Sequence, residues 1–399
     1  MEKKEKQALE GEKTIIGIDL HPDSLTAVAV QGTALECRQL WMDNAVPTAD
    51  YQRWLKRRVN TGSVLIFEAG NNTFEFARLA RQSGAEAIVI DSRKLGQIRK
   101  SHFENDKIAA RKIARSYLSG MALDSEVWQP DEATRTRRQI ISTYNQAVTN
   151  ATRTKNQLRS YLGEHAVRLP AKFRLTASDA LDKILKTHSW NPAQRQLVSV
   201  KMKELWHAES TRKEMLTAIV IEVKNDRAMS SLIQLCGIRA ITAFALIAAI
   251  GDINRFDSPK KLASYIGLVS CGHQSGKTES RWGLSKFGLK HLKSILIQAA
   301  QAIYRSKNQS GAALKQWGVK MAFRKGKPSA IAAMARKLAV AIWYQLKGFM
   351  PAVMEQPQII ATKLRHIIAE MNPQSFISMG FKSKEDFFQE FCLVIDLRC

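Results

Sequence analysis

The N-terminal third of the sequence alternates short apolar runs with amphipathic stretches that have the period of a helix. The expected strands are residues 15–20, 25–30, 35–41, 64–69 and 85–91, and the expected helices are residues 49–59 and 74–84. The first three strands follow one another as in an antiparallel meander, and the later strands are separated by helices. This order predicts an α/β domain in which helices cover a sheet. The early hairpin and the lack of a GxGxxG motif distinguish it from a dinucleotide-binding fold.

The middle of the chain, residues 131–225, is polar, poor in glycine and strongly helical in pattern. Leucine and isoleucine supply apolar faces, and basic residues recur between them. We therefore expect a helical hairpin or coiled-coil arm, interrupted near Pro170 and Pro192. A plain helical linker explains the pattern as well as an arm that dimerises or grips RNA.

Residues 229–256 predict two short helices around a turn at Gly237. The pattern resembles a helix-hairpin-helix, in which backbone amides at a helix start bind phosphate without reading sequence, so Gly237 is a candidate nucleic-acid contact. The segment PKKLASYIGLV (residues 259–269), a loop from 270 to 288 and two helices up to residue 348 are expected next. The tail after residue 355 predicts no function. The expected domains are residues 1–125, 126–228, 229–350 and 351–399.

The charge of the chain narrows the choice of partners. Its 399 residues include 61 Lys+Arg and 36 Asp+Glu, which gives a formal net charge of +25. Residues 257–350 hold 17 Lys/Arg and only two acids, Asp257 and Glu279. Because a solvated surface normally mixes both signs, this segment predicts contact with a polyanion, and nucleic acid is the first candidate.

The sequence shows no signal peptide, no membrane-spanning stretch and no cysteine spacing typical of a zinc site or a disulfide framework. The N-terminal residues are polar and charged, without the apolar segment of a signal peptide. Apolar stretches such as residues 243–250 are too short to span a bilayer. The five cysteines show no CxxC spacing, which argues against a zinc site and a disulfide framework. We expect a cytoplasmic protein without a membrane partner.

Three acids stand at the ends of predicted elements in the N-terminal region. Asp19 ends the first strand, Glu68 ends the fourth, and Asp106 opens a helix-like stretch. Carboxylates at the ends of adjacent strands, joined by one from a helix end, can converge on a hard cation such as Mg²⁺. Two ions held in this way stabilise the attacking and leaving oxygens in phosphoryl transfer. A single acid of this kind is more typical of a turn or a helix cap, so the metal-site hypothesis depends on all three.

The predicted loop from 270 to 288 is a second candidate site, because it concentrates serines, glycines and cations. Glycine beside a serine lets the hydroxyl approach a backbone without steric conflict. Nearby cations favour alkoxide formation and bind phosphate. Ser275 is the best candidate nucleophile, and Lys277, Arg281 and Lys286 are candidate phosphate-binding residues.

Other residues of this loop compete for the same roles. Ser270 and Ser280 are rival nucleophiles, whereas Ser285 is expected to cap a helix beginning at Lys286. His273 is a candidate general base, although a loop histidine is more often incidental. A flexible phosphate-binding loop without a nucleophile explains the same residues.

The order of these features resembles the transposases of the insertion-sequence 110 family, which includes Piv-type DNA invertases and RNA-guided bridge recombinases. The resemblance covers roughly residues 14–348 and rests on the strand ending in Asp19, FEAG, NDKIAARKIA, the helical arm, CGIRAITAFALIAAIGDINRF, and SYIGLV followed by QSG and LSKFG. It implies a RuvC-like (RNase H-like) N-terminal domain in which Asp19, Glu68 and Asp106 bind Mg²⁺. It also implies that Ser275 forms a covalent phosphodiester with DNA.

The resemblance implies a recombinase acting on donor and target DNA under the guidance of a bridge RNA encoded in its own element. Homodimers and homotetramers are expected, with the metal domain of one subunit completing the serine site of another. In a bacterial cell the protein would associate with the nucleoid when it acts. Competing hypotheses are a RuvC-type metal-dependent nuclease or junction resolvase, and a catalytically inactive nucleic-acid-binding protein.

One position departs from the family pattern. The family has a fourth acid three residues after the third, and here that position is Ala109. The acid is naturally missing, was replaced by design, or is substituted by another acid such as Glu104. Because a lost carboxylate weakens binding of Mg²⁺, an impaired metal site is expected.

Overall fold

The computed structural model describes residues 13–91, 105–122, 125–275, 278–285, 287–307 and 311–397, without the side chains of 271–275 and 278–282. The chain divides into two compact units, Met1–Gln129 and Pro130–Cys399, which are described separately. Within the described residues, no helix is long and apolar enough to cross a membrane.

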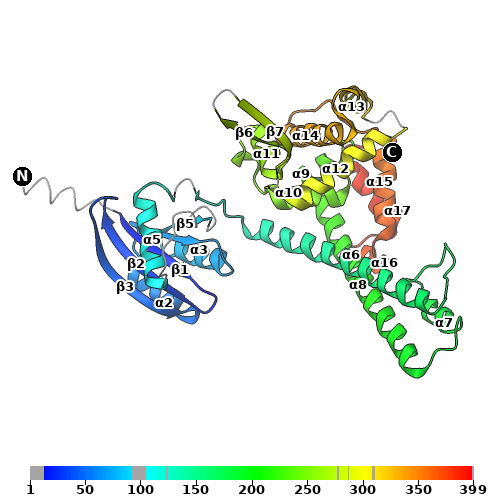
Figure 1. Cartoon of the computed structure of the whole chain (residues 1–399), viewed down its shortest axis with the longest axis horizontal. Helices are drawn as coiled ribbons and strands as arrows, with labels where there is room; N and C mark the ends of the chain where they lie inside the picture. Colours follow the sequence, from blue (N-terminus) through cyan, green and yellow to red (C-terminus); the bar gives the residue numbers. More distant parts are fainter. Residues whose placement is uncertain are drawn as a thin grey trace, which may run out of the picture. The chain divides into compact units, whose positions relative to one another are not determined.

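The first unit is built on a five-stranded mixed sheet of order β3-β2-β1-β4-β5 (Figure 1). Its strands are β1 (Thr14–Leu20), β2 (Ser24–Gly32), β3 (Cys37–Pro47), β4 (Ser63–Glu68) and β5 (Glu86–Ile90). β1, β2 and β3 form an antiparallel meander, and β4 and β5 continue the sheet in parallel with β1. The predicted strands and the α/β class of this unit are confirmed.

Helices cover both faces of this sheet. Since alternate residues of a strand point to opposite faces, Ile16 packs in one apolar cluster with residues of α2 (Tyr51–Arg58) and α3 (Thr73–Gln82). Ile15 packs in the other cluster with residues of α5 (Asp106–Leu118). The sheet is therefore the middle layer of three.

α5 lies directly on β1 at Gly17. A Cβ atom placed on Gly17 would lie 2.1 Å from the carbonyl oxygen of Ala110 and 2.5 Å from the backbone nitrogen of Ala114. No side chain fits into that space, so glycine is required for the two backbones to approach. The contact fixes the height of α5 over the sheet, and with it the position of Asp106.

The second unit begins with the arm, made of α6 (Glu132–Glu164) and α8 (Pro192–Asn225). Ile141, early in α6, shares a cluster with Val220, late in α8, whereas Leu158 shares another with Val198. The two helices therefore run antiparallel, and the predicted helical hairpin is confirmed. Pro192 occupies the first turn of α8 behind an Asn191 capping box, where proline costs no hydrogen bond.

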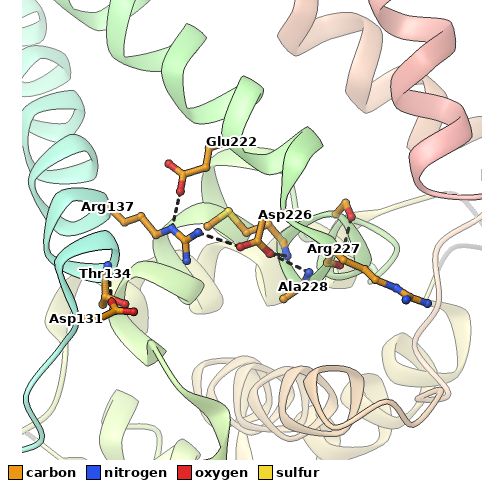
Figure 2. A network of polar contacts seen from close by, with 9 residues as sticks. Asp131, Thr134, Arg137, Glu222, Asp226, Arg227 and Ala228 are labelled. Atoms are coloured by element: carbon orange, nitrogen blue, oxygen red, sulfur yellow. Dashed lines mark hydrogen bonds and ion pairs between the residues drawn. The ribbon is translucent and has the colours of Figure 1, made fainter.

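An ion-pair network joins the two arm helices at the end nearer the body of the unit (Figure 2). Arg137 donates to Glu222 at 2.5 Å and to Asp226 at 3.0 Å. Asp226 also accepts the backbone N–H of Ala228 at 2.9 Å, which caps the next helix, α9 (Arg227–Ile233). The bend between α8 and α9 is thus held by one carboxylate that serves both elements.

The body of the second unit is mostly helical. Its elements after α9 are α10 (Ala240–Ile250), α11 (Pro259–Ile266), β6 (Ser270–Ser275), β7 (Thr278–Leu284), α12 (Lys290–Arg305), α13 (Ala312–Lys325) and α14 (Lys327–Leu346). The helix–turn–helix around Gly237 is confirmed.

Three expectations for this region are wrong. The segment from 270 to 284 is an antiparallel hairpin and not a loop, because its residues pair across two strands. Three helices and not two follow it up to Leu346, since Gly326, with φ +81°, ends α13 before α14 begins. Ser285 caps no helix, because α12 begins at Lys290 with Leu289 in the cap position.

The tail packs into the same core as the body of the second unit. It forms α15 (Pro357–Glu370), α16 (Pro373–Ser378) and α17 (Lys384–Val394). Ile360, Leu364, Phe387 and Phe391 are buried in the cluster that contains Phe244 of α10. Lys224 of α8 also bonds Glu390 of α17. The tail is therefore a structural part of the second unit. The sequence alone had indicated no role for it.

Replacing Gly17 by alanine should destabilise the first unit. The added methyl group must push α5 away from β1, and overpacking of this kind costs about 1–3 kcal/mol or more. Gly163→Ala is the matched control, because Gly163 lies in α6 and an added Cβ meets nothing within 4 Å. Thermal unfolding should show a lower midpoint for Gly17→Ala and an equal or higher one for Gly163→Ala. Equal midpoints for Gly17→Ala and the parent chain would contradict the close-contact argument.

Candidate functional site

The strand register places Asp19 and Glu68 at one edge of the sheet. β1 and β4 run parallel, with Ile18 paired to Phe67, so the next residues on the two strands are Asp19 and Glu68. Glu68 is half-buried, and its carbonyl accepts the hydroxyl of Thr73 at 3.1 Å. Both acids therefore occupy the carboxyl edge, where α/β proteins place their sites.

α5 brings Asp106 to the same edge. The side chain of Asn105 accepts the N–H of Ile108 at 2.9 Å and caps the helix, which leaves Asp106 exposed in the first turn. Among the described residues, ligand atoms of Asp19, His21 and Asp106 all lie within 4.8 Å of one another. Nε2 of His21 lies 3.5 Å from Oδ2 of Asp19 and 3.5 Å from Oδ1 of Asp106. Glu68 is not in this group, although it ends the neighbouring strand.

His21 was missed in the sequence. It follows Asp19 by two residues, in the turn between β1 and β2, and that spacing was the only available signal. Hydrogen bonds to Ser24, Asn72 and Thr48 hold the backbone of this turn. The N–H of His21 donates to the carbonyl of Ser24 at 2.9 Å. The amide of Asn72 donates to the carbonyls of His21 at 3.1 Å and Pro22 at 2.6 Å, and the hydroxyl of Thr48 donates to Pro22 at 3.0 Å.

The donor set fits a divalent cation. Two carboxylates and an imidazole are ligands of divalent metals, and their atoms are close enough to share one ion. The side chains of Asp19, His21 and Asp106 are 21%, 46% and 55% exposed, so a substrate phosphate can reach them. Ala109 is buried, at 6% exposure, and supplies no donor. Glu104, its suggested substitute, lies outside the described residues.

The hairpin of the second unit carries the candidate serine. Ser275 is the last residue of β6 and pairs with Thr278. Its rivals pair elsewhere, Ser270 with Leu284 and Ser280 with His273. Lys277 and Lys286 lie outside the described residues. The side chains of Ser275, Arg281 and His273 are likewise not described, so their roles stay predictions.

Close backbone contacts fix the base of this hairpin. A Cβ atom on Gly267, whose φ is +89°, would lie 2.4 Å from the carbonyl oxygen of Phe287. One on Gly288, whose φ is +94°, would lie 2.6 Å from the nitrogen of Gly267. The N–H of Ser285 donates to Val269 at 2.9 Å. Glycine is required at both positions, and the hairpin therefore projects from a rigid base.

Gly237 is packed into the protein. Its φ is +75°, and an added Cβ would lie 3.2 Å from Cβ of Ala299 in α12. The neighbouring N–H groups of Cys236 and Ile238 donate to the carbonyls of Val353 and Leu235 at 2.9 and 3.1 Å. These contacts explain the glycine by packing, and its contact with nucleic acid stays a prediction.

The turn between α13 and α14 carries a cationic surface. Between Glu279 and Glu355 the sequence contains no carboxylate. Arg324, Lys325 and Lys327 are exposed at this turn, together with Phe323 at 86% exposure. An aromatic ring among cations can stack on a base while the cations bind phosphates.

The segment that holds the helix–turn–helix, the hairpin, α12 and the start of α13 has known relatives. Residues 229–316 match the family described as Transposase IS116/IS110/IS902 family. Over this segment the chain is similar to that transposase family. The resemblance inferred from the sequence is therefore confirmed.

Similarity to transposases also extends beyond the matched segment. The putative transposase y4qE of Sinorhizobium fredii is 27% identical over 297 residues, which cover 72% of this chain and 71% of the relative. The putative transposase y4rJ of the same organism is 28% identical over 316 residues, covering 72% and 79%. The transposase for insertion sequence element IS1111A of Coxiella burnetii is 35% identical over 107 residues, covering 27% and 29%.

Ala109→Asp should strengthen the metal site. The new carboxylate would stand one helical turn from Asp106 on the same face, and burial near other acids would cost stability until a cation binds. We expect a lower unfolding midpoint in EDTA than the parent, a larger rise on adding Mg²⁺, and tighter Mg²⁺ binding by calorimetry. Lys107→Asp, which adds an exposed acid beside Asp106, is the control for general attraction of cations. The same gain in both variants would argue against a fourth ligand position at residue 109.

Proposed function

We propose that this chain is a DNA transposase that cuts and rejoins strands through a covalent link between Ser275 and a DNA phosphate. The observation that carries the proposal is the family match over residues 229–316, which includes the whole hairpin with Ser275 at the end of β6. The rigid base at Gly267 and Gly288 supports it, since a nucleophile must be held in position.

The chemistry is a pair of phosphoryl transfers. The hydroxyl oxygen of Ser275 forms a bond to phosphorus, the bond to one strand's sugar oxygen breaks, and the serine proton leaves to water or to that oxygen. A hydroxyl of a second strand then attacks the phosphoserine, which restores the serine and joins the two strands. Each step exchanges one ester bond for another, so no external energy source is needed.

Asp19 and Asp106, with Glu68 on the neighbouring strand, would hold Mg²⁺ in the first unit. When bound, the ion would neutralise charge on the phosphate oxygens. The chain's own part is to hold these carboxylates at the sheet edge, through the β1–β4 register and the contact at Gly17.

The partners we propose are donor and target DNA and an RNA encoded in the same element. The 17 cations between residues 257 and 350 supply the charge for phosphate contacts, and Arg324 and Lys325 lie exposed at the α13–α14 turn. The arm is proposed as an RNA-binding or dimerising element, in a homodimer or homotetramer in which two chains complete one site.

Ser275→Ala should abolish the covalent adduct and strand cleavage but leave nucleic-acid binding intact, because only the nucleophilic oxygen is removed. The adduct can be measured by denaturing electrophoresis after incubation with Mg²⁺, the RNA that co-purifies with the chain, and DNA from its element. Ser270→Ala and Ser280→Ala are matched controls in the same hairpin. If the adduct survives in Ser275→Ala but disappears in one of the controls, the serine replaced in that control is the nucleophile. Cleavage with no adduct in any of the proteins would favour a RuvC-type nuclease instead.

Affinity for nucleic acid should fall by about 10³–10⁵ between 50 and 200 mM salt if six to ten phosphates are contacted. Arg324→Ala combined with Lys325→Ala should reduce the slope of log affinity against log salt by roughly one to two, about 0.9 for each phosphate lost. The control is Arg53→Ala with Lys56→Ala, two exposed cations on α2, of which Arg53 lies 3.7 Å from Asp50. Fluorescence anisotropy measures both. A slope that is unchanged in the first pair, or reduced equally in both, would remove the α13–α14 turn from the binding surface.

A further inference from the structure

The imidazole of His21 stands between two carboxylates of the acidic site. Its Nε2 is 3.5 Å from Asp19 and 3.5 Å from Asp106, and all three ligand atoms lie within 4.8 Å of one another. The carboxylates come from a strand end and a helix start, whereas His21 comes from a turn. Three separate elements therefore direct donors to one point.

We propose that His21 is a direct metal ligand of this site and sets its preference among divalent ions. The inference rests on the proposed metal-binding role of the acids. It adds a nitrogen donor where Ala109 leaves the family's fourth carboxylate position without one. It also predicts a site that favours Mn²⁺ over Mg²⁺ more than an all-carboxylate site would, because imidazole suits transition metals better than Mg²⁺.

Hydrogen bonds hold the backbone of the turn that carries His21 in place. Its N–H donates to Ser24, and its carbonyl accepts from Asn72, which also donates to Pro22. Thr48 holds the same carbonyl of Pro22 from another element. These bonds use backbone groups of the turn and not the ring, so the ring can face the two carboxylates while the position of the side chain is restricted. A ligand held before binding loses less conformational entropy when the ion arrives.

A second reading of the same distances is that a charged His21 only neutralises Asp19 and Asp106. The two readings predict changes of opposite sign. Removing a ligand weakens metal binding, whereas removing a competing counter-charge strengthens it, because the carboxylates are then more available to the ion. Measuring metal affinity after removal of the ring therefore separates them.

The experiment uses the full chain and Mn²⁺ as the probe. Binding is titrated by electron paramagnetic resonance, and nitrogen coordination is detected as ¹⁴N modulation in electron spin echo spectra of the bound ion. The parent should show the modulation. His21→Ala should lose it and bind Mn²⁺ at least about tenfold more weakly, since even outer partners of metal ligands are worth about 10–100-fold.

Three further variants complete the design. His366→Ala removes an exposed histidine on α15 and should change neither the modulation nor the affinity. His21→Asp replaces nitrogen by oxygen, so it should abolish the modulation, keep a metal site and let Mg²⁺ compete more effectively with Mn²⁺ than in the parent. Asp19→Asn identifies the signal that belongs to this site. Because His21 is half exposed and its turn is held by backbone bonds, His21→Ala, His366→Ala and Asp19→Asn should unfold at similar temperatures in EDTA. His21→Asp places a third carboxylate beside Asp19 and Asp106, so it should unfold at a lower temperature in EDTA and recover when Mn²⁺ binds.

Each remaining outcome overturns the inference in a distinct way. Binding that depends on Asp19 but shows no ¹⁴N modulation refutes the inference and leaves the proposed metal site intact. Equal or tighter Mn²⁺ binding by His21→Ala assigns His21 as a counter-charge and not a ligand. If the parent shows no binding that Asp19→Asn removes, both the inference and the metal part of the proposed function fail, while the serine chemistry is tested separately by its adduct.

Discussion

The backbones of α5 and β1 touch at Gly17, and the acidic site depends on this contact. Helices that cover a sheet normally stand off it by the length of their side chains, about 10 Å between axes. At Gly17 the space is too small for even a Cβ atom, so α5 lies unusually close to the sheet. That closeness allows Asp106, a short side chain at the helix start, to reach the end of β1, where Asp19 lies. Gly17 takes no part in chemistry, but its contact with α5 brings Asp106 close to Asp19.

The second unit also has a close backbone contact between glycines, at the base of its hairpin. Gly267 and Gly288 approach where side chains would clash, and the two strands between them carry the candidate serine outward. Such contacts cannot slide without separating the backbones, so they define position more strictly than apolar packing does. In both units the residues proposed for chemistry lie on an element that starts from, or packs on, a glycine contact.

The sequence predicted the first unit well because its strands and helices are buried on defined faces, and burial imposes period two or 3.6 on the residues. The convergence of Asp19 and Asp106 followed from where elements end. The hairpin was mistaken for a loop because serine and glycine dominate it, and its strands depend on pairing between residues such as Gln274 and Glu279. His21 was missed for a related reason. Its place beside the acids is set by Thr48 and Asn72, which are distant in sequence.

The balance of charge explains why a nitrogen ligand would suit this acidic site. A nucleic-acid phosphate is repelled by bare carboxylates, so the acids of a strongly basic protein become useful near DNA only when cations cover them. Asp19, Glu68 and Asp106 offer three negative charges, and Ala109 removes the fourth expected for the family. A neutral imidazole adds a donor without adding charge. An ion held by two carboxylates and His21 would therefore keep more of its positive charge for the phosphate than one held by carboxylates alone. The missing acid and a nitrogen ligand at His21 would then act in the same direction, towards an ion that polarises a bound phosphate more strongly.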